Sequence, residues 1–163
     1  MRAGVNDGDL RTATLGDVRE MASWVGSARE CELWAGPRMP FPLDVSQLPA
    51  RIDFGRVGTF ALWAGERQVA FGQIVPKARR RAHLARVIVA PQVRGRGHGE
   101  RLIRLLIEEA HRQSHTRVSL NVDRGNVPAI ALYSKLGFCE IDRPADEPDE
   151  HGGSRYMELR GWP

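Results

Sequence analysis

The sequence has few of the residues that mark several common protein classes. Its two cysteines, Cys31 and Cys139, lie far apart and form no Cys-x-x-Cys pair, so neither a disulfide framework nor a zinc site is indicated. No stretch approaches the ~18 consecutive apolar residues of a membrane span. The N-terminal segment also lacks the apolar core of a signal peptide. We therefore expect a cytoplasmic protein with no metal and no membrane partner.

Two nucleotide-binding patterns are absent or poorly matched. No Gly-Lys-Ser/Thr occurs, which excludes a P-loop. The spacing Gly95-x-Gly97-x-Gly99 differs from the Gly-x-Gly-x-x-Gly of dinucleotide folds. Asp123 comes late for the acidic residue that such folds place about 20 residues further on. Dinucleotide binding is therefore a poor match.

The composition indicates one ordinary globular domain with an uneven charge distribution. Of the 163 residues 42% are apolar and 27% charged, and the formal net charge is +4. Basic residues dominate 77–104, where Glu100 is the only acid, and acidic residues dominate 140–150 around Arg143. This pattern favours a positive side for an anionic ligand. A nucleic-acid-binding module is disfavoured, because few aromatics accompany the arginines and no recognised motif occurs.

Residues 87–102 predict a strand, a glycine-rich loop and a helix that together hold an anion. Glycines let main-chain N–H groups converge without clashes of Cβ atoms. A helix N-terminus adds unpaired N–H donors and a partial positive charge. Arg94 and Arg96 add guanidinium groups suited to phosphate oxygens. A phosphate or pyrophosphate is the expected ligand.

Hydrophobic periodicity predicts the strands and helices of an α/β domain. Thr14 and Asn126 are expected N-caps, and Gly137 is expected to end the last helix. The stretch 31–49 contains too many prolines for a regular helix. The expected strands are 10–14, 59–64, 68–75, 82–90, 117–122, 138–142 and 155–160, and the expected helices are 15–28, roughly 45–52, 98–113 and 127–136.

Two sequence blocks together resemble the GNAT superfamily of N-acetyltransferases. Residues 94–99 read Arg-Gly-Arg-Gly-His-Gly, which is similar to its pyrophosphate loop, and residues 126–138 are similar to its Asn-x-x-Ala-x-x-Leu-Tyr-x-x-x-Gly-Phe motif. The resemblance implies a single α/β domain over 1–163, with a mixed sheet that is splayed at its centre and flanked by helices on both faces. It implies a cofactor-binding core at about 81–140 and acceptor-side elements at about 15–55 and 143–156.

The resemblance also implies roles for individual residues. The loop would wrap the pyrophosphate of acetyl-CoA, the preceding strand would offer main-chain groups to the pantetheine arm, and Asn126 would contact the cofactor as well as cap its helix. Tyr133 would be the general acid that donates to the leaving sulfur. The cofactor-binding residues implied are Val87, Ile88, Val89, Arg94, Gly95, Arg96, Gly97, His98, Gly99, Glu100, Asn126 and Tyr133.

The general base and the acceptor are less determined. Asn121 stands where bacterial ribosomal-protein acetyltransferases carry a glutamate, so neither that base nor that substrate class is transferred. His83 lies near the base position of histone-type members and is a candidate base. Glu140, Asp142 and Asp123 are alternatives, as is a water chain without a dedicated base. Trp24, Trp34, the stretch 37–43 and the acidic loop 146–150 are expected near the acceptor entrance.

The implied function is transfer of an acetyl group from acetyl-CoA to a primary amine of a small molecule or peptide. The amine would attack directly in a ternary complex, with acetyl-CoA as co-substrate, no metal and no nucleic acid partner. The resemblance leaves homodimerisation open. A second function class is a non-catalytic acyl-CoA-binding regulatory domain, which predicts cofactor binding without amine-dependent release of CoA.

Overall fold

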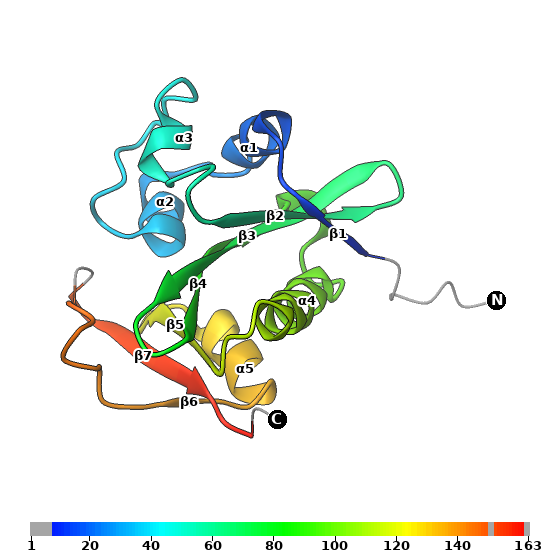
Figure 1. The fold of residues 1–163 in the computed structure, drawn as a ribbon. Coiled ribbons are helices and arrows are strands. Elements are labelled where there is room, and N and C mark those ends of the chain that lie inside the picture. Colours follow the sequence, from blue (N-terminus) through cyan, green and yellow to red (C-terminus); the bar gives the residue numbers. More distant parts are fainter. Residues whose placement is uncertain (1–7, 150–151, 162–163) are drawn as a thin grey trace.

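The computed structural model describes residues 8–149 and 152–161, which form one seven-stranded sheet covered by helices. Helices α1, α2 and α3 lie on one face and α4 and α5 on the other (Figure 1). The strand order is β1-β2-β3-β4-β5-β7-β6, with only β4 and β5 parallel. This arrangement confirms the predicted mixed α/β sheet. No helix in the described ranges is long and apolar enough to cross a membrane.

The helices and strands agree closely with those predicted from the sequence, except near the N-terminus. The strands are β1 (Asp9–Thr12), β2 (Gly58–Ala64), β3 (Arg67–Lys77), β4 (Arg81–Val89), β5 (Arg117–Asp123), β6 (Phe138–Glu140) and β7 (Ser154–Leu159). The helices are α1 (Leu15–Ala22), α2 (Ala28–Ala35), α3 (Leu48–Arg51), α4 (His98–Arg112) and α5 (Val127–Lys135), with a 3₁₀ turn at Pro91–Val93.

The predicted helix over 15–28 was wrong, because the chain forms two helices there. Helix α1 ends at Ala22, and α2 begins after Ser27, whose hydroxyl accepts a hydrogen bond from the Glu30 N–H at 3.1 Å. The Glu30 carboxylate in turn accepts from the Gly26 N–H at 2.7 Å. Ser27-x-x-Glu30 is a capping-box sequence, so this helix start was readable from the chain. Helix α2 also overturns the expectation that 31–49 holds no regular helix, since it runs to Ala35 before the prolines.

Helix α4 forms the core on one face of the sheet. Leu102, Ile103, Leu106 and Ala110 are fully buried and recur at helical spacing, as the sequence predicts. They pack against β3 and β4, where Gly72 lets the helix approach: a Cβ at this position would lie 3.0 Å from Leu106 Cδ1. This packing fixes the start of α4 beside the end of β4.

The sheet opens between β4 and β5, as the predicted central splay requires. The parallel ladder runs from Arg81↔Arg117 to Leu84↔Leu120 and then stops, although β4 continues to Val89. At the same point the register with β3 shifts from Gln73↔Ala85 to Phe71↔Ile88, which places one extra residue in β4. This β-bulge bends the strand away from β5. A wedge therefore opens in the middle of the sheet (Figure 1).

Candidate functional site

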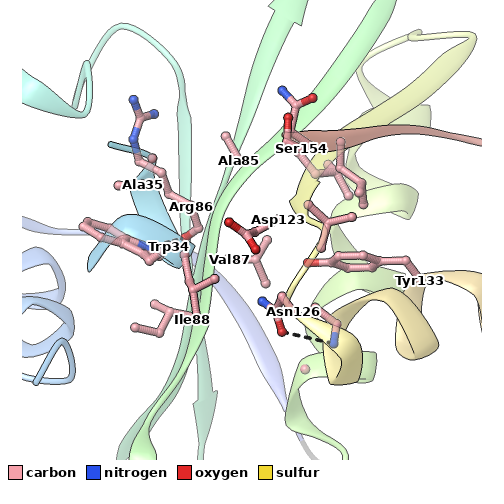
Figure 2. A pocket seen from close by; sticks show the side chains of 18 of the residues that line it. Trp34, Ala35, Ala85, Arg86, Val87, Ile88, Asp123, Asn126, Tyr133 and Ser154 are labelled. Carbon is pink, nitrogen blue, oxygen red and sulfur yellow. Dashed lines mark hydrogen bonds between the residues drawn. The ribbon is translucent and has the colours of Figure 1, made fainter. Parts of the chain in front are cut away.

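The wedge between β4 and β5 forms a cleft of about 1170 Å³. That volume is above the roughly 300–1,000 Å³ of a typical small-ligand pocket. One wall is β4 with Trp34 of α2, and the other is Asp123, Asn126 and Tyr133 (Figure 2). The cleft runs from the start of α4 toward the loop before β7, which also lines it.

One end of the cleft is the N-terminus of α4. The N-cap, Gly97, has φ 86° and offers no side chain to its helix, and Gly95 has φ 74°. Helices α1, α2 and α5 each have a side-chain cap instead. The first N–H groups of α4 therefore have no side-chain acceptor and face the cleft together with the helix dipole. Such an end fits an anion such as a pyrophosphate.

The charged side chains of this loop differ in what they contact. Arg94 lines the cleft, donates to Val89 O at 3.2 Å and lies 3.4 Å from Glu30 of α2. Arg96 is exposed and is not among the residues that line the cleft. Glu100 lines it, but its carboxylate is bound by Lys135 at 2.7 Å and Arg104 at 3.0 Å. These two cations hold the pKa of Glu100 below its usual value and offset its charge near an anion.

The second half of β4 offers its edge to the cleft. Val87, Ile88 and Val89 all line it, and their main chain has no partner on β5. An unpaired strand edge presents N–H and C=O groups to any extended, amide-containing ligand. Gly99 lets α4 and α5 approach this edge, since a Cβ there would lie 3.4 Å from Val89 Cγ2.

Asn126 and Tyr133 come from α5 and face the cleft. The Asn126 side chain caps the helix, accepting from the Ala129 N–H at 3.4 Å, as predicted (Figure 2). The Tyr133 ring packs edge-on against Phe138, and its hydroxyl points between the splayed strands (Figure 2). This hydroxyl has no hydrogen-bond partner in the part of the chain that the structure describes. Burial raises the pKa of Tyr133 to about 12, so the phenol keeps its proton at neutral pH.

His83 and Asn121 lie together on the wall of the cleft at the other end. Arg143 donates to Asn121 Oδ1 at 2.9 Å, so the amide nitrogen of Asn121 faces His83 Nε2 at 3.4 Å. His83 Nδ1 then donates to Ser119 Oγ at 2.9 Å. Burial lowers the pKa of His83 to about 4, with the Glu147 carboxylate opposing that shift and nearby cations adding to it. The imidazole is therefore neutral at pH 7.

The acidic loop before β7 is largely neutralised from within. Glu147 is buried, receives Arg81 Nη2 at 2.7 Å and lies 3.4 Å from Lys77 Nζ. Asp146 lies 3.5 Å from Arg81, and Asp149 lies 3.5 Å from Arg143. Glu150 is outside the described residues. All three carboxylates over 146–149 therefore have cationic partners.

Of the other residues that the sequence suggested for the site, some line the cleft and others lie elsewhere. Trp34 lines the cleft, whereas Trp24 is buried in the core and does not. Asp123 lines it and pairs with Arg29 of α2 at 3.2 Å. Glu140 and Asp142 are not among its lining residues. In the described ranges no three His, Cys, Asp or Glu residues are grouped to hold a metal.

Arg86, which the sequence reasoning missed, also lines the cleft. It is the residue at the bulge, with φ 51°. Nothing in the apolar run around it signals a bulge, since a bulge depends on the register with the neighbouring strand. Only the paired strands show where this side chain points.

Comparison with known proteins decides the family. The family model described as "Acetyltransferase (GNAT) family" matches residues 27–138. The chain belongs to the GNAT family. The match includes the loop at the start of α4, both splayed strands and Tyr133.

Individual GNAT relatives are similar in sequence or in fold. Mycothiol acetyltransferase of Corynebacterium glutamicum is 36% identical over 77 residues, which are 47% of this chain and 26% of that protein. An uncharacterized N-acetyltransferase of Bacillus subtilis is 40% identical over 58 residues, which are 36% of this chain and 24% of that protein. The chain thus spans about a quarter of the length of these two relatives.

Two solved structures cover nearly the whole chain. The ribosomal-protein-S18-alanine N-acetyltransferase of Escherichia coli superposes with a TM-score of 0.66 at 25% identity, covering 93% of this chain and 92% of that one. The spermidine N-acetyltransferase of Vibrio cholerae, solved with CoA and spermine, gives 0.74 at 18% identity, covering 93% and 94%. The similarity to the spermidine N-acetyltransferase shows a shared GNAT fold and nothing about the substrate.

Proposed function

We propose that this protein transfers an acetyl group from acetyl-CoA to a primary amine by direct attack in a ternary complex. The observation that carries the proposal is a single cleft that joins an uncapped helix N-terminus, an unpaired strand edge and the Tyr133 hydroxyl. Membership of the GNAT family and relatives named as acetyltransferases support this chemistry.

The residues at the α4 end of the cleft would bind acetyl-CoA. The N–H groups around Gly97 and Gly99 would hold the pyrophosphate, with Arg94 beside them once it leaves Glu30. The main chain from Val87 to Val89 would pair with the amides of the pantetheine arm. Contacts of acetyl-CoA with Arg96, Ile88 and Asn126 stay predictions. Arg96 would act as an exposed cation beside the loop.

Tyr133 would act on the leaving sulfur. As the amine attacks the thioester carbonyl, the C–S bond breaks and negative charge develops on sulfur. A protonated phenol without another acceptor is a suitable donor to that charge. Free CoA then leaves with a proton on its sulfur, and the acceptor leaves as an amide.

His83 would serve only as a transient proton acceptor. It is in the neutral form that a base requires, but a pKa of about 4 makes it a weak one. Its Nε2 lone pair faces Asn121, which also lines the cleft. The proton lost by the amine would therefore pass through this polar wall to solvent.

The test is release of CoA from acetyl-CoA across a panel of small amines and basic peptides, with mass spectrometry of the products. We expect amine-dependent release that falls about 100-fold in Tyr133→Phe while acetyl-CoA affinity is kept. The matched control is Ser134→Ala, which removes a hydroxyl from the exposed neighbour of Tyr133 on α5, a residue that does not line the cleft. Tight binding with no release for any amine would favour the non-catalytic regulatory domain instead.

The remaining expectations are independent of this test. A cytoplasmic location, a homodimer and the absence of nucleic acid or membrane partners stay predictions.

A further inference from the structure

A partly buried guanidinium stands in the half of the cleft that lies away from α4. Arg86 lines the cleft, and in Figure 2 its side chain extends away from Asn126, beyond Ala85 and Trp34. Asn126 and the α4 N-terminus are at the proposed cofactor end. If acetyl-CoA occupies that end, Arg86 faces the space left for the acceptor.

The strand is built so that this side chain is held in place. The bulge puts Arg86 at φ 51°, a conformation that non-glycine residues rarely adopt, and bulges redirect side chains beside active sites. Trp34 Nε1 donates to the Arg86 carbonyl oxygen at 2.9 Å. The guanidinium donates to Gln73 Oε1 at 2.8 Å, and Gln73 is itself fixed by its bonds to Ile52 O and Thr59 Oγ1.

The guanidinium nevertheless lacks an anionic partner. Among the described residues no carboxylate lies within 4.0 Å of it, and its Nε is buried without a hydrogen-bond partner. Burial lowers the pKa of Arg86, and the more distant Asp53 only opposes that shift. Lys77, Arg81, Arg94 and Arg143, which line or border the cleft, each have a carboxylate within 4.0 Å. Arg51 also lines it and contacts Gln47 instead, but its side chain is exposed to solvent.

Even a partly buried cation is costly in a folded protein when it has no counter-ion, and a ligand can supply the missing charge. A guanidinium fork matches a carboxylate in geometry as well as in charge. We infer that the acceptor is a primary amine that also carries a carboxylate, and that Arg86 binds this carboxylate while the amine faces the thioester. The inference rests on the proposed acetyl transfer and narrows its acceptor class.

The first experiment needs no substitution. CoA release by the unaltered protein would be measured with matched acceptors: amino acids, the same compounds with the carboxylate converted to an amide, and the corresponding amines without a carboxyl group. We expect kcat/KM to be about ten- to hundredfold higher for the free carboxylates. Equal or better use of the amides and simple amines would overturn the inference but leave acetyl transfer standing. No release with any amine would contradict the proposed function itself.

The second experiment tests whether Arg86 causes the preference for acceptors with a free carboxylate. In Arg86→Gln we expect kcat/KM for carboxylate acceptors to fall to the level of their amides, mostly through KM, with acetyl-CoA affinity kept. Arg86→Lys, which keeps the charge but not the fork, should retain part of the preference. The control is Arg56→Gln, the same loss of charge at an exposed residue that does not line the cleft. An unchanged preference in folded Arg86→Gln would refute the role of Arg86.

Discussion

The two halves of β4 differ in how they are paired and not in charge, since each contains one arginine, Arg81 or Arg86. The half from Arg81 to Leu84 contains an arginine and a histidine, yet it is buried and paired on both sides. The half from Ala85 to Val89 contains the valines and isoleucine typical of a sheet interior, yet it has no partner toward β5 and lines the cleft. Hydropathy therefore does not indicate which half is structural. The neighbouring strand and the acidic loop decide this.

Damage to the loop that follows the cleft half of β4 should remove ligand binding without unfolding the protein. In Gly97→Asp a side chain and a negative charge enter the N-terminus of α4, where φ is 86°. We expect acetyl-CoA affinity to fall about 100-fold or more, measured by calorimetry. Gly65→Asp, in the β2–β3 turn with φ 61° and open space for its Cβ, is the matched control. Unchanged acetyl-CoA affinity in Gly97→Asp would show that the anion site lies elsewhere.

Damage to the paired half should instead reduce stability. Glu147→Gln removes the main partner of Arg81, which is 1% exposed. We expect the free energy of unfolding to fall by about 3 kcal/mol, because a buried charge loses its counter-ion and only Asp146 remains. Chemical denaturation measures the loss. Glu140→Gln breaks the exposed ion pair with Arg124 and should lower the free energy of unfolding by less than about 1 kcal/mol. An equal loss in the two variants would contradict the difference between buried and exposed ion pairs.

The buried His83 should make the paired half sensitive to pH. Its pKa of about 4 in the folded protein is below the ordinary 6.5, so the unfolded chain binds a proton first as pH falls. Stability should therefore be lost between about pH 6.5 and pH 4, by up to ~3 kcal/mol. Melting temperatures across this range should fall less steeply in His83→Gln. Parallel curves for the two proteins would show that this histidine is not buried as a neutral group.

The smallest expected effect is at Gly72 of β3, opposite the bulge in β4. In Gly72→Ala the new Cβ would lie 3.0 Å from Leu106 Cδ1 and 3.4 Å from Val87 Cγ2. We expect a loss of about 1 kcal/mol, since the Leu106 side chain can shift slightly. Gly16→Ala in α1, where the nearest atom is Thr14 Oγ1 at 3.4 Å, should not lower the melting temperature. If Gly72→Ala and Gly16→Ala change the melting temperature equally, stability does not depend on the close packing of α4 on β3 and β4.

Local signals in the chain predicted the regular elements and their caps. The apolar periodicity of α4, the Asn126 cap and the Thr14 cap all appear where the pattern places them. The error at 15–28 came from extending one helix across Gly26, although Ser27 and Glu30 carry their own helix-start signal. Trp24 was expected near the acceptor entrance from its place in the resembled fold, but its neighbours in space make it part of the core.

The sequence by itself determined the order of elements, the glycine loop before α4 and the Asn126–Tyr133 helix, because capping, turns and amphipathic spacing act over a few residues. Only the tertiary structure decided that β4 separates from β5 after Leu84, that Glu147 neutralises Arg81, and that Arg86 enters the cleft without a counter-ion. Each of these depends on strand register or on contacts between residues far apart in the chain. A register shift of one residue reverses which face a side chain occupies, and no local pattern records it.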